Sequence, residues 1–127
     1  MCGIVAYLTA YSNGFGYNES KVFNNMLFLD TLRGWDSTGV FGVSNVGNVG
    51  ILKAAINAPN FMQTQEYKDF MADAVKNGMC LVGHNRAATR GSVTDANAHP
   101  FVIDDNIILV QNGTWNGSHK HIKDNLS

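Results

Sequence analysis

The chain opens with MCGIVAYLT, residues 1–9, and this stretch decides where the fold begins. From Gly3 to Thr9 the side chains alternate and then run apolar, in a manner typical of a buried strand. The turn-forming stretch Ser12-Asn13-Gly14 closes it. The chain is therefore predicted to begin inside a sheet.

Two helices are predicted further along the chain. From Glu19 to Leu32 the apolar residues recur at helical spacing, with Asn18 or Ser20 as the N-cap and Gly34 as the stop. A second helix is predicted from Gln65 to Lys76.

The other predicted elements are strands and one long loop. Because strand, helix, hairpin, helix and further hairpin strands follow one another, the expected class is α+β and not a doubly wound parallel sheet. A polar loop is expected from Asn85 to Pro100, and a helix start from Ser118 to Leu126. The predicted strands are Thr38 to Ser44, Val49 to Ala55, Met79 to Gly83, Phe101 to Ile103 and Ile107 to Gln111.

Size and charge limit the classes of function. The 127 residues, 45% of them hydrophobic, suit one domain with one core. The formal net charge is -1 and neither sign forms a block, so nucleic acid and membrane are not expected partners. The opening apolar run is too short for a signal peptide or a membrane span, and a cytoplasmic protein is expected.

Cys2 is the first candidate for chemistry. Removal of Met1 would leave a thiol and a free α-amino group on one residue. Such an amine has a pKa of about 8 and a thiol one of about 8.5, so the amine can accept the thiol proton near neutral pH. Taken alone, a cysteine at this position is as readily an accident of composition, so other segments have to decide.

Five short motifs occur in an order and at a spacing that make coincidence improbable. They are Met1-Cys2-Gly3-Ile4, RGWDSTG at 33–39, GHNRAATRG at 83–91, NAHPF at 97–101 and Gln111-Asn112-Gly113. Together they resemble the glutaminase domain of class II glutamine amidotransferases, which are N-terminal nucleophile (Ntn) hydrolases, and the hexosamine-phosphate synthase pattern most of all. The resemblance implies an αββα sandwich of antiparallel sheets flanked by helices, with L-glutamine as substrate and no cofactor.

The resemblance also implies catalytic roles. Cys2 matches the nucleophile that attacks the glutamine amide carbon and passes through a thioester, with its own amine as general base. Asn112 and the backbone N–H of Gly113 match the oxyanion hole, where each donor lowers the barrier by roughly 3 kcal/mol in comparable sites. Read without the resemblance, Asn-Gly is the preferred hairpin turn.

At the substrate's other end, Arg86 matches the arginine that receives the α-carboxylate, a task that suits a planar guanidinium. Thr89 and the backbone near Arg90 would complete that end of the pocket. Ala87 and Arg90 stand where many members have an aromatic residue and a histidine, so the loop over bound glutamine is expected to pack differently. Without the resemblance, both arginines read as solvated loop charges.

Five further residues are expected to support the site. Gly3 follows the nucleophile, Arg33 matches an arginine that holds the segment around it, and Asp36 matches an aspartate that braces the turn. His84 and His99 could pair with Cys2 as in a papain-like protease, but an N-terminal amine makes a histidine base unnecessary. Both histidines are therefore predicted to shape the site.

The remaining cysteine and histidines carry no predicted chemistry. His119 and His121 form a His-x-His without a carboxylate or cysteine at ligand spacing, so no metal site is expected. Cys80 lies in an apolar run, where a thiol behaves as a small buried hydrophobe.

The match covers residues 1–127 as the N-terminal portion of one glutamine amidotransferase domain. The resemblance implies a further acidic residue for the glutamine α-amino group, and the chain stops before it. An incomplete sheet would leave an unpaired edge, so a homo-oligomer is among the assemblies allowed. The acceptor or synthase domain is expected elsewhere, on another chain or region. The alternative is a non-catalytic binding or assembly protein that keeps Met1.

Overall fold

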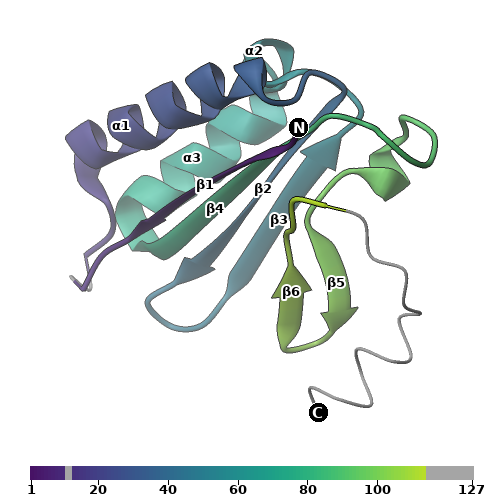
Figure 1. Ribbon diagram of the computed structural model, residues 1–127. Coiled ribbons are helices and arrows are strands. Elements are labelled where there is room, and N and C mark those ends of the chain that lie inside the picture. The colour runs from purple at the N-terminus through teal and green to yellow at the C-terminus, as the bar shows by residue number, and fades with distance from the viewer. Residues whose placement is uncertain (11–12, 114–127) are drawn as a thin grey trace.

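The computed structural model describes residues 1–10 and 13–113 (Figure 1). Its strands are β1 (Gly3–Leu8), β2 (Ser37–Ser44), β3 (Val49–Ala54), β4 (Gly78–Arg86), β5 (Phe101–Asp104) and β6 (Ile107–Leu109). Its α-helices are α1 (Gly16–Leu29), α2 (Ala58–Phe61) and α3 (Gln65–Asn77). Two 3-10 turns are η1 (Asp30–Leu32) and η2 (Asp95–Asn97).

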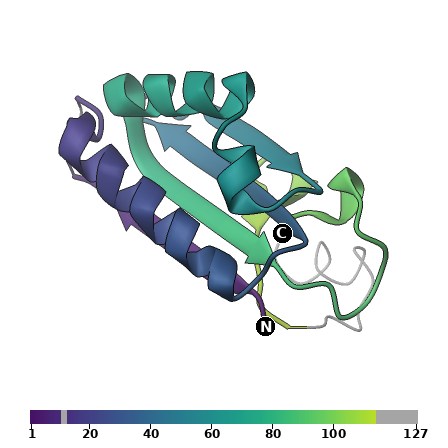
Figure 2. The ribbon, with the colours of Figure 1, turned by 90° about the horizontal axis from the view of Figure 1, so that it is seen from above.

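One antiparallel sheet carries the fold. Its strands run in the order β1-β4-β2-β3, so β1 pairs with β4 although most of the chain separates them. Helices α1 and α3 lie side by side over one face, as the view from above shows (Figure 2). The core forms between helices and sheet from side chains that include Val5, Phe23, Leu27, Val40, Phe61, Tyr67 and Leu81.

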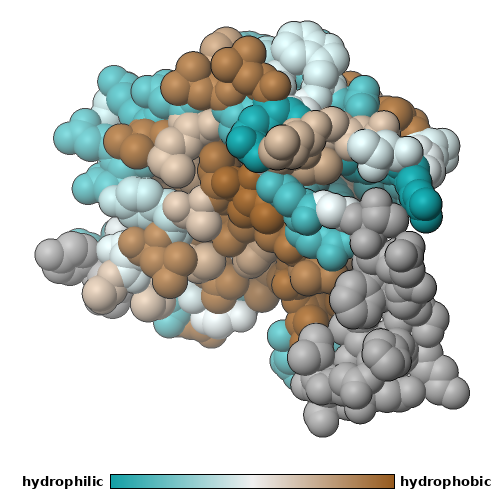
Figure 3. All heavy atoms as spheres, viewed as in Figure 1, coloured by the Kyte–Doolittle hydropathy of each residue, from teal (hydrophilic) through white to brown (hydrophobic). Residues whose placement is uncertain are grey.

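The opposite face of the sheet is apolar and partly open. Hydrophobic residues gather over it between the helices and the β5–β6 hairpin (Figure 3). Strand alternation puts every second side chain on this face, and several are exposed: Ile4 at 41%, Leu8 at 72%, Val49 at 48% and Ile51 at 39%. An apolar area of this kind is typical of a surface that another layer covers.

The β5–β6 hairpin stands on this same face, at the end of the sheet where β1 begins. A Cβ on Gly39 of β2 would run into the His99 carbonyl, which shows how closely the segment before β5 approaches the sheet. The described residues are thus α+β with antiparallel sheets. The more specific Ntn-hydrolase sandwich stays a prediction.

The start of the first helix was predicted wrongly. Helix α1 begins at Gly16 after Phe15, and no side chain caps it, so neither Asn18 nor Ser20 is the N-cap. Phe15 is only 3% exposed, and its burial fixes the entry of the chain in place of a cap. After η1, a Cβ on Gly34 would lie 2.5 Å from the Asn85 carbonyl oxygen, so this glycine also permits close contact with β4.

Strand β4 is longer than predicted, and the long loop is shorter. Residues 84–86, expected in part as loop, pair with β1 through Gly3 and with β2 through Ser37. Neighbouring strands on both sides supply the backbone hydrogen bonds of this segment, so it is a strand although its polar sequence does not predict one. The short helix α2 was not predicted, whereas the β2–β3 and β5–β6 hairpins and helix α3 are confirmed. The predicted helix at 118–126 lies outside the described residues.

Candidate active site around Cys2

Cys2 lies at the junction between the start of β1 and the end of β4. The Ala87 N–H donates to Cys2 Sγ over 3.4 Å, and Sγ lies 3.6 Å from the Ala87 carbonyl oxygen. The antiparallel pairing that sets Gly3 opposite Asn85 puts the two segments together. The half-buried sulfur therefore sits against the backbone where β4 gives way to the loop.

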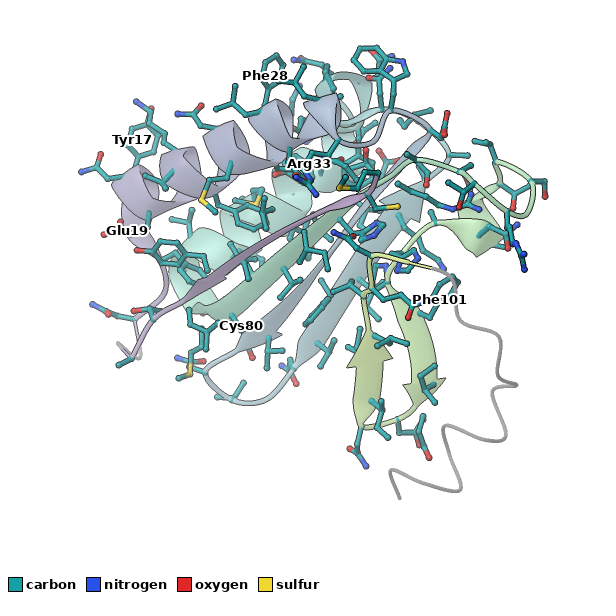
Figure 4. All side chains as sticks on the ribbon, viewed as in Figure 1. Tyr17, Glu19, Phe28, Arg33, Cys80 and Phe101 are labelled. Atoms are coloured by element: carbon teal, nitrogen blue, oxygen red, sulfur yellow. The ribbon has the colours of Figure 1, made fainter. Side chains whose placement is uncertain are left out.

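Two side chains from distant segments converge on the Cys2 carbonyl. Arg33 Nε donates to it over 3.1 Å and Asn112 Nδ2 over 2.9 Å. Figure 4 shows Arg33 beside the first residues of β1. Arg33 Nη2 also reaches the Met1 sulfur at 2.8 Å. Three of the residues singled out in the sequence thus lie together, with Cys2 at the centre.

Gly3 is held in place by what lies behind it. A Cβ at this position would overlap the Asp30 carboxylate. Asn85, fully buried, donates to Asp30 Oδ2 over 3.2 Å and to the Leu27 carbonyl over 2.9 Å, and it accepts from Thr38 Oγ1 over 3.1 Å. Burial raises the pKa of Asp30, while the bond from Asn85 and the nearby Arg33 oppose that rise.

Asp36 fastens the turn that follows β4. Its Oδ2 accepts from the Ala88 N–H over 2.6 Å, and its own N–H donates to the Arg86 carbonyl over 2.9 Å. Because Ala87 lies between these two points, Asp36 sets the backbone that faces the Cys2 sulfur.

Arg86 is buried, at 8% exposure, and points into the loop that follows it. Nη1 donates to the Ser92 carbonyl over 3.1 Å and Nη2 to the Arg90 carbonyl over 2.5 Å. A guanidinium has five N–H donors, so these two bonds leave others for a ligand. Thr89 and Arg90 are exposed.

The two predicted site-shaping histidines form a stacked pair. The His84 and His99 rings lie 4.0 Å apart between centroids and 15° from parallel. Among the described residues neither ring bonds to Cys2. Both rings bond to the backbone of Gln111, and the Asn112 side chain also bonds to His84. Asn112 and Gly113 follow directly and are exposed, Gly113 with a φ of +129°. The alternative of a hairpin turn into residue 114 lies outside the described residues.

Sequence reasoning missed three residues that organise this region. Thr38 and Asn85 form the buried network behind Gly3, and Lys53 Nζ donates to the carbonyls of Ala96, Ala98 and Pro100 at 3.3, 2.9 and 3.1 Å. Burial lowers the pKa of Lys53, and the negative charge of Asp95 partly offsets this decrease. The one available signal was a polar Asn85 between residues of a sheet-like run.

Two surface hollows of about 150 and 310 Å³ lie at other places. One is lined by β2, β3 and α3 and the other by Tyr7 and the turn before α1. Neither touches Cys2. Within the described ranges, no three His, Cys, Asp or Glu side chains cluster as metal ligands would, and no helix there is long and apolar enough to cross a membrane. His119 and His121 lie outside those ranges.

Comparison with known proteins adds a relationship in sequence. No protein-family model matches the chain. Glutamine–fructose-6-phosphate aminotransferase (isomerizing) from Idiomarina loihiensis is 34% identical over 101 residues, 74% of this chain and 14% of that protein. The enzymes of that name from Campylobacter jejuni and Sulfurisphaera tokodaii are 34% and 32% identical over 99% of this chain, which is 19% and 20% of their lengths.

Among solved structures, a complex of the beta-clamp processivity factor with the little finger domain of PolIV has a TM-score of 0.49 at 8% identity, over 72% of this chain and 94% of that chain. The sequence matches are the informative ones. The chain spans a fifth or less of the length of the curated relatives it matches. It is therefore related in sequence to a segment of the glutamine–fructose-6-phosphate aminotransferases.

Proposed function

We propose that this chain is a glutamine amidotransferase domain of the Ntn-hydrolase type, which hydrolyses the side-chain amide of L-glutamine through a thioester on Cys2. One observation carries the proposal. Arg33 and Asn112, from segments far from each other in the sequence, both bond to the carbonyl of Cys2, whose sulfur receives the Ala87 N–H. The sequence relationship to the glutamine–fructose-6-phosphate aminotransferases supports it.

The nucleophile requires loss of Met1. That residue is 81% exposed, which suits its removal by an aminopeptidase. The freed amine takes the thiol proton, and the sulfur attacks the amide carbon of glutamine. When the tetrahedral intermediate collapses, the C–N bond breaks and the ammonium returns its proton to the departing ammonia. Water then hydrolyses the thioester to glutamate and the free thiol.

Negative charge builds on the former amide oxygen during both steps. The Asn112 amide has two N–H donors, and the bond to the Cys2 carbonyl uses one of them. The second is available to an oxyanion beside Cys2, together with the Gly113 N–H. A donor fixed before the reaction stabilises the transition state without a reorganisation cost.

The α-carboxylate of glutamine is assigned to Arg86. Arg86 directly precedes Ala87, whose N–H faces the Cys2 sulfur. Two carbonyl oxygens of the following loop accept hydrogen bonds from the Arg86 guanidinium and hold it in place. Thr89 and the Arg90 backbone belong to that same loop and would close over the substrate. The ammonia acceptor is left open, because the chain covers only 14% to 20% of the relatives whose name includes fructose 6-phosphate.

The test is ammonia release from L-glutamine by the purified chain. Cys2→Ala should abolish it, and Cys80→Ala should leave it intact, because Cys80 lies at the other end of β4, opposite Leu8 (Figure 4). Burial raises the pKa of the Cys80 thiol, which keeps that thiol protonated and unreactive. Equal rates from wild type and Cys2→Ala would refute the proposal.

The alternative function is a binding or assembly protein that retains Met1. The contact between Arg33 Nη2 and the Met1 sulfur favours it, since an uncleaved methionine would add to the packing around Cys2. In that form the Cys2 nitrogen is an amide and cannot act as a base. The intact mass of the purified chain separates the two functions.

A further inference from the structure

The stacked histidine pair holds the backbone of a single residue, Gln111, from two sides. His84 is fully buried and His99 is 8% exposed, so both rings are fixed by their surroundings. His84 Nε2 lies 2.9 Å from the carbonyl oxygen of Gln111. The N–H of the same Gln111 donates to His99 Nδ1 over 3.3 Å. Both polar groups of one residue's backbone are therefore bound by imidazoles.

These bonds determine where the protons lie. A carbonyl oxygen only accepts, so His84 Nε2 must carry hydrogen, and an N–H only donates, so His99 Nδ1 must be bare. His84 Nδ1 is buried and has no hydrogen-bond partner among the described residues. A proton on it would be a buried donor without an acceptor, which is costly. Both rings are therefore neutral, with hydrogen on Nε2.

The electrostatic surroundings act in the same direction. The pKa of His99 is lowered to about 3, mainly by burial and further by the electrostatic effect of His84, Arg86 and Lys53. Burial also lowers the pKa of His84, with Arg86 adding to the effect and the bonds to Gln111 and Asn112 opposing it. The charged groups around the pair are thus Lys53 from β3 and Arg86 from β4, with Asp95 beside Lys53.

The held residue directly precedes Asn112, whose side chain reaches the carbonyl of Cys2. Gln111 itself lies beyond β6 and outside the sheet ladder, so the two imidazole bonds take the place of strand pairing there. A shift of this peptide would move Asn112 away from Cys2.

We propose that His84 and His99 are positioning residues, a neutral stacked pair that clamps the Gln111 peptide and thereby places Asn112 beside Cys2. The catalytic consequence rests on the proposed function, but the clamp does not. Among the described residues, no hydrogen bond joins either ring to Cys2.

Crossed substitutions test each bond separately. The nitrogen of a glutamine amide can occupy the place of Nε2, and the oxygen of an asparagine amide the place of Nδ1. His84→Gln therefore keeps a donor to the Gln111 carbonyl, and His84→Asn loses it. His99→Asn keeps an acceptor for the Gln111 N–H, and His99→Gln loses it. Each pair differs only in side-chain length.

Hydrogen exchange of the Gln111 amide is the readout that does not need activity. The two mismatched variants, His84→Asn and His99→Gln, should exchange this proton at least about tenfold faster than their matched partners, since an opening free energy lower by about 1.4 kcal/mol corresponds to tenfold. Equal exchange across all four variants would overturn the clamp. Nitrogen-15 spectra of the wild-type rings at pH 7 should show both as Nε2–H tautomers, and a proton on either Nδ1 would also overturn it.

Kinetics then connect the clamp to the site. Loss of one oxyanion donor costs about 10²- to 10³-fold in kcat in comparable enzymes, so the mismatched variants should lose about tenfold or more in kcat. Their KM for glutamine should change by less than about threefold, because the Arg86 contacts are untouched. Equal kcat losses in matched and mismatched variants would refute the clamp alone. A wild type that releases no ammonia, with exchange as expected, would refute the proposed function alone.

Discussion

Replacing Asn85 by alanine tests the network behind the nucleophile. Its fully buried amide makes three hydrogen bonds, to Thr38, to the Leu27 carbonyl and to the Asp30 carboxylate. The two neutral bonds contribute about 1 kcal/mol each and the bond to a carboxylate about 2, so Asn85→Ala should lower the unfolding free energy by about 4 kcal/mol at pH 7. Asn25→Ala, on the exposed face of α1, should change it by less than about 0.5 kcal/mol.

The loss should also depend on pH in a defined direction. Burial raises the folded-state pKa of Asp30 above 3.8, so the cost of ionising it grows as pH rises through that range and is relieved at low pH. Without the Asn85 bond, which lowers this pKa, the cost at neutral pH is larger. Urea unfolding should therefore show a greater loss at pH 7 than at pH 4. A loss under about 1.5 kcal/mol, or one that is equal at both pH values, would refute the reasoning.

Three further substitutions probe the scaffold by urea unfolding. Lys53→Met keeps the apolar stem but removes three donations to loop carbonyls, and about 2 kcal/mol should be lost; no loss would mean that water replaces them. Gly39→Ala places a Cβ on the His99 carbonyl and should lower the unfolding free energy by at least about 2 kcal/mol. Gly47→Ala has open space around its Cβ but a φ of +84°, so it should cost only about 1 kcal/mol. A larger loss for Gly47→Ala than for Gly39→Ala would contradict the close packing at Gly39. Thr64→Ala removes the N-cap of α3 and should cost about 1 kcal/mol, and a neutral result would show that the cap is dispensable.

The sequence predicted the elements whose signals are local. Helix α3 ends at the stop signal Asn77-Gly78, and the β2–β3 hairpin has a Gly/Asn-rich turn, so both were placed within a residue or two. The start of α1 was missed because Phe15 fixes it through burial, a tertiary effect. The end of β4 was missed because its strand character comes from partners on both sides.

The site shows the same division. Motifs pointed to Cys2, Arg33 and Asn112, which the structure brings together. The tie between His84, His99 and the Gln111 peptide depends on a stacking geometry that no spacing encodes. The role of Lys53 could not be read from the sequence, because its three carbonyl partners come from a loop more than 40 residues later.

The central claim is that Cys2 becomes the first residue and acts as the nucleophile. Intact-mass and peptide mass spectrometry, before and after treatment with a diazo-ketone analogue of glutamine, measures this most directly. The account predicts a chain that lacks Met1 and gains one adduct, on Cys2 and not on Cys80. A chain that keeps Met1, or an adduct absent from Cys2, would contradict it.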